Sequence, residues 1–103
     1  MTRSFAVNAI DTIIHGKLRL GAMAYLASHR TASFSDLKAA LETSDGNLSI
    51  NMQKLEAASY VSVTKSFSDR RPVTRYSITE TGRAAFARYL DVMSTLMGDE
   101  SEA

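Results

Sequence analysis

Apolar residues recur every three or four positions over the first half of the chain, a spacing that places them on one face of a helix. Three isoleucines predict a first helix over residues 7–14, and His15 with Gly16 then interrupts the pattern. Residues 17–28 resume it with apolar side chains on more than one side. A helix that is apolar over so much of its surface belongs in the interior of a domain.

Two further helices are predicted, each preceded by a serine that can cap it. Ser35 precedes a helix over residues 36–42, and Ser44 precedes a helix over residues 45–58. A serine hydroxyl in this position accepts one of the backbone N–H groups that the first turn leaves without a partner. Only Thr43 and Ser44 separate the two helices, so this part of the chain has the arrangement of a helix-turn-helix.

After residue 58 the spacing of apolar residues changes from about 3.6 to 2, which is the period of a β-strand. Residues 60–67 alternate in this way, residues 69–72 form a turn cluster, and residues 73–78 alternate again. Two short strands around a turn predict a β-hairpin.

Thr79 can cap a last helix over residues 80–97, and Gly82 permits another element to approach the first turn of that helix closely. The predicted order is four helices, a hairpin and a final helix. We therefore expect a mainly α fold with a small β-hairpin wing, a winged helix-turn-helix. It forms one domain over residues 1–97, and residues 98–103 form an acidic tail that we expect to be disordered.

Composition narrows the class of protein. The chain has 103 residues, of which 45% are hydrophobic, enough for one domain with a packed core. It has no cysteine, which excludes a disulfide scaffold and a thiolate metal site and fits a reducing compartment. The first residues lack the pattern of a signal peptide, and no apolar run approaches the roughly 20 residues needed to span a bilayer. We therefore expect a cytoplasmic protein with no membrane partner.

Positive charge is concentrated in the predicted hairpin, although the net charge of the whole chain is only +1. Residues 62–78 contain one acidic residue, Asp69, and four basic residues, which are Lys65, Arg70, Arg71 and Arg75. A local basic patch of this kind is what a polyanionic partner such as nucleic acid requires.

Several short runs resemble winged-helix regulators of the MarR and ArsR superfamily, and most of all compact members with little beyond the winged helix. The run Ser44-Asp45-Gly46-Asn47-Leu48-Ser49, followed by residues 54–57 and Tyr60-Val61, is similar to their recognition helix. Residues 15–20 resemble their first core helix, and residues 76–83 resemble the exit from their hairpin. The resemblance implies a DNA-binding transcription regulator.

Two positions depart from the pattern of these regulators. They usually have glycine after the recognition helix, where the chain turns left-handed, and this chain has Ser59. They commonly have a basic residue or histidine near the position of Asn51, which is polar and uncharged.

The helix over residues 45–58 has one apolar and one polar side. Leu48, Met52 and Leu55 lie at positions i, i+4 and i+7, so they should face the core. The opposite side suits the major groove of double-stranded DNA, where amides bond adenine and an apolar group contacts a thymine methyl. The contacts expected from this helix and its start are Ser44, Asn47, Ser49, Ile50, Asn51, Gln53 and Lys54. The alternative is a merely solvated helix, with Ile50 an ordinary surface residue or packed on the hairpin.

The hairpin should supply contacts that do not depend on sequence. Arg70 and Arg71 at its tip can bind phosphates or enter a narrow minor groove, and Lys65 and Arg75 would lie beside the DNA backbone.

The last helix has more apolar surface than one subunit needs. Phe86, Leu90, Met93 and Met97 form one stripe, and a second stripe lies beside it. One stripe can close the core while the other binds a second copy of the chain. The residues predicted for this homodimer interface are Phe5, Ile10, Ile13, Tyr89, Val92, Met93 and Leu96. The alternative is that the terminal helices pack on each other within one subunit.

Enzymatic activity has little support. His15 and His29 lack a carboxylate at helical spacing, and the chain has no glycine-rich phosphate loop and no metalloprotease or hydrolase motif. We expect no cofactor and no bound metal, since no metal ligands cluster. A small-molecule effector would have to bind at the dimer interface, and the sequence does not identify one. The competing interpretation is a winged helix that binds another protein and not DNA.

Overall fold

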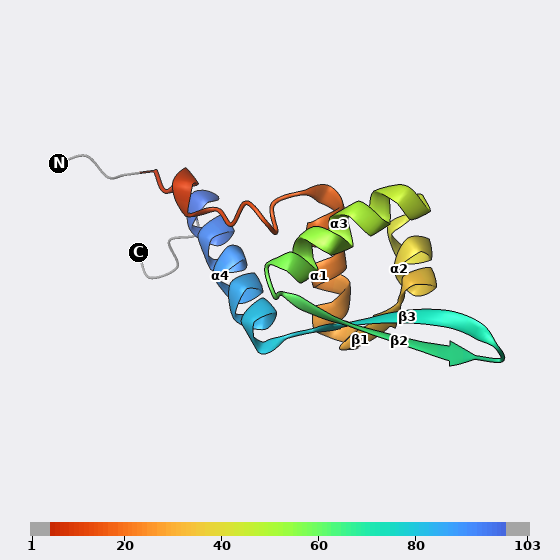
Figure 1. Ribbon diagram of the computed structural model, residues 1–103. Coiled ribbons are helices and arrows are strands. Elements are labelled where there is room, and N and C mark those ends of the chain that lie inside the picture. Colours follow the sequence, from red (N-terminus) through yellow and green to blue (C-terminus); the bar gives the residue numbers. More distant parts are fainter. Residues whose placement is uncertain (1–4, 99–103) are drawn as a thin grey trace.

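The computed structural model describes residues 5–98, which form four α-helices and a three-stranded antiparallel sheet (Figure 1). The elements are a 3₁₀ turn η1 (Val7–Ala9), α1 (Lys17–His29), β1 (Thr31–Ser33), α2 (Phe34–Leu41), α3 (Asp45–Ala57), β2 (Val61–Ser68), β3 (Arg71–Ile78) and α4 (Glu80–Leu96). This is the expected winged helix-turn-helix, in which α2 and α3 are the two helices of the motif and β2–β3 is the wing. The predicted acidic tail covers residues 98–103. Residues 99–103 lie outside the described residues, so only Gly98 of this tail is described.

The core lies where α1, α2 and α3 meet the base of the sheet. The side chains that are almost completely buried there are Ile14, Met23, Leu26, Leu37, Leu48, Met52 and Leu55. Three of them, Leu48, Met52 and Leu55, form the inner side of α3, as the periodicity predicts. Within residues 5–98 no helix is long and apolar enough to cross a membrane.

The sheet has the strand order β1-β3-β2, so β2 lies at an edge. The short strand β1 was not predicted because three residues are too few to show an alternation. The hairpin turns through Asp69 and Arg70, which have φ values of 52° and 66°. A two-residue turn with both φ values positive matches the twist of the flanking strands, although asparagine and glycine usually occupy it. Beyond Val63 all residues of β2 are exposed, and the hairpin projects away from the helices (Figure 1).

Two of the three predicted helix caps are confirmed. The Ser44 hydroxyl accepts the N–H of Asn47 at 3.2 Å, and the Thr79 hydroxyl accepts that of Gly82 at 2.9 Å. The prediction that Ser35 caps α2 is wrong, because the helix begins two residues earlier.

Ser33 is the residue that caps α2. Its hydroxyl accepts the N–H of Asp36 at 3.0 Å, and the Asp36 carboxylate accepts the N–H of Ser33 at 3.3 Å. Two N–H groups are satisfied by this reciprocal pair, whereas a cap at Ser35 would satisfy one.

The predicted helix over residues 7–14 is also wrong, since only the turn η1 forms there. The Asp11 carboxylate accepts the N–H groups of Ile13 at 2.8 Å and Ile14 at 3.1 Å. An aspartate that bonds the N–H groups just after it offers the backbone an alternative to the helical hydrogen bonds. The other Asp11 oxygen accepts the Tyr60 hydroxyl at 2.6 Å, which ties this segment to the end of α3.

The start of α4 is docked against the junction of α3 and β2. Ser59 in that junction has a φ of 64°, so the chain does turn left-handed there without a glycine. Gly82 faces the Tyr60 backbone so closely that a Cβ would overlap the Tyr60 carbonyl oxygen. The close approach predicted for Gly82 is therefore confirmed. The rest of α4 leads away, and its far end lies opposite the hairpin tip (Figure 1).

Candidate nucleic-acid interface

The outer side of α3 is polar and open to solvent. Asn47, Ile50, Gln53 and Lys54 are exposed, while Ser49 and Asn51 are half-buried at its borders. Ile50 is 56% exposed, so more than half of its side chain is left uncovered in this subunit. Lys54 is the only charged residue on this side of the helix.

Hydrogen bonds organise part of this surface. Gln53 Nε2 donates to the Ser49 hydroxyl one turn earlier at 3.4 Å. Asn51 Nδ2 donates to the Asn47 carbonyl at 2.7 Å, and Asn51 Oδ1 accepts from Arg19 at 2.6 Å. Asn51 is thus engaged within the protein, whereas the Asn47 side-chain amide has no protein partner within residues 5–98.

Arg19 was not predicted as part of the site. It belongs to α1, where it interrupts a nearly apolar run, and that interruption is the only signal the sequence offers. Its guanidinium places a second positive charge beside the middle of α3, in addition to Lys54.

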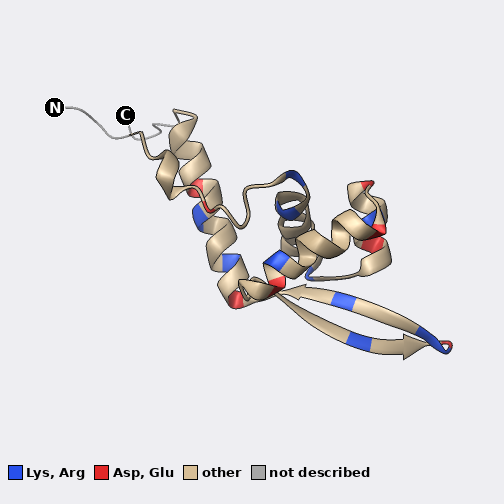
Figure 2. Ribbon diagram, turned by 45° about the horizontal axis from the view of Figure 1, so that its top comes forward, with Lys and Arg blue, Asp and Glu red and all other residues tan. Residues whose placement is uncertain are grey.

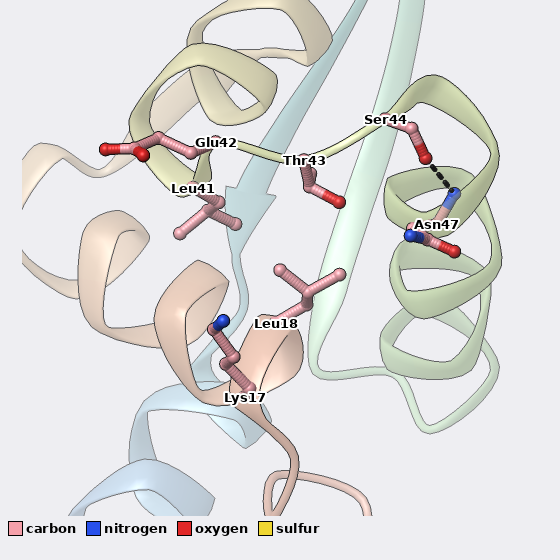
Figure 3. Close-up of a pocket in the computed structure, with 7 residues that line it drawn as sticks. All are labelled: Lys17, Leu18, Leu41, Glu42, Thr43, Ser44 and Asn47. Carbon is pink, nitrogen blue, oxygen red and sulfur yellow. Dashed lines mark hydrogen bonds between the residues drawn. The ribbon is translucent and has the colours of Figure 1, made fainter.

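The start of α3 borders a hollow beside the helix-turn-helix turn. It is lined by Lys17, Leu18, Leu41, Glu42, Thr43, Ser44 and Asn47 (Figure 3). The Ser44 hydroxyl points back to the Asn47 N–H, as the dashed line in Figure 3 shows. Asp45 is paired with Lys38 at 2.8 Å on the surface, which partly offsets its negative charge at this helix start. An exposed pair of this kind adds little to stability.

The basic residues of the wing are all exposed, and Figure 2 shows them on both strands and at the tip. Lys65 pairs with Thr74, and Arg75 pairs with Thr64. Paired residues point to the same side of a sheet and successive residues to opposite sides. Lys65 therefore lies on one face of the hairpin and Arg75 on the other. The wing is a ribbon with positive charge on both faces and at its end.

Phe67 is an exposed apolar residue of the wing. It is 76% exposed and pairs with Pro72 next to the turn. It lies on the same side of β2 as the buried Val61, but the hairpin extends beyond the core at this point.

The residues predicted for a dimer interface have different degrees of burial. Tyr89 is only 3% exposed, and its hydroxyl is hydrogen-bonded to His15 Nδ1 at 2.9 Å, so it packs inside its own subunit. The half-buried residues are Ile10, Ile13, Val92, Met93 and Leu96. The exposed apolar residues on these two segments are Phe5, Val7, Leu90 and Met97. Of these four, only Phe5 was among the residues predicted for the dimer interface.

Two tyrosines have altered acidity. The hydrogen bond to the Asp11 carboxylate is the main cause that raises the pKa of Tyr60, and burial adds to it. Burial raises the pKa of Tyr76. Both effects belong to structural contacts. Among residues 5–98 no group of three or more His, Asp or Glu side chains could hold a metal ion.

Comparison with known proteins places these features among regulators. A family model described as a winged helix DNA-binding domain matches residues 18–97. An uncharacterized protein of Methanocaldococcus jannaschii is 35% identical over 78 residues, which make up 76% of this chain and 85% of that protein.

Solved structures agree with this match. The structure of a transcriptional regulator homologue protein from Pyrococcus horikoshii OT3 has a TM-score of 0.78 and 31% identity, and covers 84% of this chain and 86% of that chain. A putative transcriptional regulator of the MarR family from Enterococcus faecalis V583 has a TM-score of 0.73 and 20% identity, over 100% and 96% of the two chains. The second likeness is one of fold alone. Together these matches confirm the resemblance seen in the sequence.

Proposed function

The chain belongs to the family of winged helix DNA-binding domains, and on this premise we propose that it is a homodimeric transcription regulator that binds specific sites in double-stranded DNA. The transcriptional-regulator fold implies DNA binding. The observation that carries the proposal is the pairing of a polar, exposed α3 surface with a basic hairpin that follows directly after it.

In the proposed complex α3 lies in the major groove. Asn47 and Gln53 have amides that can bond the edge of a base, and Ile50 can contact a thymine methyl. The sequence also predicts contacts from Ser44, Ser49, Asn51 and Lys54, and of these Asn51 already has its amide bonded to Arg19 and to the Asn47 carbonyl. An exposed isoleucine among polar groups supports this assignment, because such a residue gains burial only when a partner covers it.

The wing lies against the DNA backbone or in the minor groove. Positive charge on both faces suits a ribbon that passes between two phosphate chains, since Lys65 can approach one chain while Arg75 approaches the other. Arg70 is held at a positive φ of 66° although it has a side chain. Such strain is costly and is often retained where a residue serves a function, here a cation at the tip of the wing.

The dimer uses the apolar surface around the far end of α4. Phe5, Val7, Leu90 and Met97 are exposed, and the half-buried residues of the predicted interface lie on the same two segments. This end of the molecule lies opposite the wing tip, so a second copy would leave the wing free (Figure 1). Two copies double the DNA contacts and match a palindromic site.

Fluorescence anisotropy with labelled duplexes from a genomic pool tests the proposal. The wild type should bind selected duplexes, and its affinity should fall steeply as salt is raised. Double charge reversal, Arg70→Glu with Arg71→Glu, should weaken binding to all sequences alike and lower the slope of log K against log salt by about 2. The matched control is Arg83→Glu with Arg88→Glu on α4, which changes the net charge equally and should have a much smaller effect on the slope.

Specificity has its own test. Asn47→Ala or Gln53→Ala should change which sequences are preferred, while the salt dependence changes little. Absence of binding to every duplex, or binding that does not respond to salt, would instead support a winged helix that binds a protein partner.

A further inference from the structure

Arg19 connects three separate parts of the molecule. From α1, its Nε–H donates to the Ile13 carbonyl at 2.5 Å, and its Nη1–H donates to Asn51 Oδ1 at 2.6 Å. The guanidinium therefore joins the N-terminal segment to the middle of α3. An arginine can hold two acceptors at once because its N–H groups form a rigid planar fork.

The orientation of the Asn51 amide follows from these bonds. Its oxygen faces Arg19 and its nitrogen donates to the Asn47 carbonyl at 2.7 Å. Bidentate recognition of adenine needs the oxygen and the nitrogen of an amide to face the same base. Because both are directed to protein groups, Asn51 is better placed to fix the surface around Asn47 than to read a base itself.

Neighbouring groups surround the guanidinium. A Cβ at position 16 would stand 2.7 Å from Arg19 Nη2, so the lack of a side chain at Gly16 leaves the guanidinium room in this position. The Ile13 carbonyl is held because the N–H of the same peptide group, that of Ile14, donates to the Asp11 carboxylate at 3.1 Å. That carboxylate also accepts the hydroxyl of Tyr60, just beyond the end of α3. The segment from Asp11 to Arg19 thus fastens α3 at its middle and at its end.

We propose that Arg19 is a positioning residue for DNA recognition, which sets the base preference of α3 by holding Asn51 and, through it, the turn that carries Asn47. The inference rests on the function proposed above. It assigns part of the sequence specificity to a residue of α1 that lies outside the recognition helix.

The test compares Arg19→Lys, Asn51→Ala and the double variant in selections from a randomised duplex pool, with anisotropy on the selected and on unrelated duplexes. Lysine keeps the charge, but its three N–H groups share one nitrogen and cannot reproduce the rigid planar fork that aims a separate nitrogen at each acceptor. Arg19→Lys should therefore keep the salt slope and the affinity for unrelated duplexes, while the ratio of specific to unrelated binding falls about tenfold. Asn51→Ala should have the same effect, and the double variant should lose no more than either single variant. Arg30→Lys, an exposed change at the end of the same helix, is the matched control and should leave the ratio unchanged.

The outcomes separate this inference from the proposed function. Selective binding by the wild type together with an unchanged ratio in Arg19→Lys would overturn the positioning role and leave the function intact. Losses that multiply in the double variant would show that the two residues act independently, and would overturn it as well. If Arg19→Lys fails to fold, Asn51→Ala removes the same contact from the other side, and an unchanged ratio there is decisive. A wild type that binds no duplex overturns both proposals.

Discussion

Replacing Gly82 by alanine would test how tightly α4 is docked against the end of α3. A Cβ at this position would overlap the Tyr60 carbonyl oxygen and stand 2.9 Å from the carbonyl carbon. That oxygen already accepts the backbone N–H and the hydroxyl of Thr79, both at 3.1 Å. The two backbones can therefore separate only by lengthening the hydrogen bonds that fix the entry into α4.

The magnitude follows from three contributions. Overpacking costs about 1–3 kcal/mol, and the upper value applies here because backbone meets backbone. Weakening of the hydrogen bonds to Tyr60 adds about 1 kcal/mol. Alanine recovers about 1 kcal/mol through its higher helix propensity. Gly82→Ala should therefore lower the free energy of unfolding by about 3 kcal/mol, a large part of the stability of a small domain.

Gly46→Ala provides a matched control, because this glycine also lies in the first turn of a helix. A Cβ at position 46 would meet no atom within 4 Å, so alanine should stabilise the protein by about 0.5–1 kcal/mol. Urea denaturation followed by circular dichroism measures the free energy of unfolding of both variants. All samples should have the same protein concentration, because association of the chains would change their stability. A Gly82→Ala variant as stable as the wild type, or more so, would refute the account of the docking.

Other contacts lead to three further predictions. Ser33→Ala should lower the free energy of unfolding by about 1 kcal/mol, and Ser35→Ala should leave it almost unchanged, because only Ser33 caps α2. Equal losses for the two variants in thermal or urea unfolding would contradict this. Ser59→Gly should raise the urea midpoint by relieving about 1 kcal/mol of strain at a φ of 64°, and a lowered midpoint would show that the serine is not strained. Folding raises the pKa of Tyr60, so its contribution to stability is complete below pH 10 and is lost as the pH rises through the raised pKa. Unfolding free energies measured from pH 9 upward should therefore fall more steeply for the wild type than for Tyr60→Phe, and parallel curves would exclude the Asp11 bond as the cause.

The sequence predicted the elements whose signals are local. The inner side of α3 could be assigned because Leu48, Met52 and Leu55 repeat at helical spacing, and the exposure of Asn47 and Ile50 follows from the same period. The missed parts depend on distant or competing contacts. β1 exists only because it pairs with β3, and its three residues carry no pattern of their own.

The errors near the helix starts have a common physical origin. Asp11 and Asp36 each have a short carboxylate side chain that can bond backbone N–H groups, and the sequence does not say which groups it selects. The hydrogen bonds of Asp11 prevent a helix over residues 7–14, and those of Asp36 move the start of α2 to Phe34.

In the candidate site too, the features with local signals were predictable and those that depend on distant contacts were not. The wing cations are exposed, as expected for residues of a turn and of strands beyond the core. The engagement of Asn51 by Arg19 and the burial of Tyr89 could not be read from the sequence, because each requires the packing of one helix against another segment.

The position of β2 at the margin of the sheet has a consequence for handling the protein. A strand without an outer neighbour offers its peptide groups to any other chain, which makes it a starting point for aggregation. Charged side chains on an edge strand discourage such pairing, and Lys65 is the only charged residue of β2. Neutralising Lys65 would thus reduce colloidal solubility together with affinity for phosphate, and light scattering is needed beside every binding curve of such a variant.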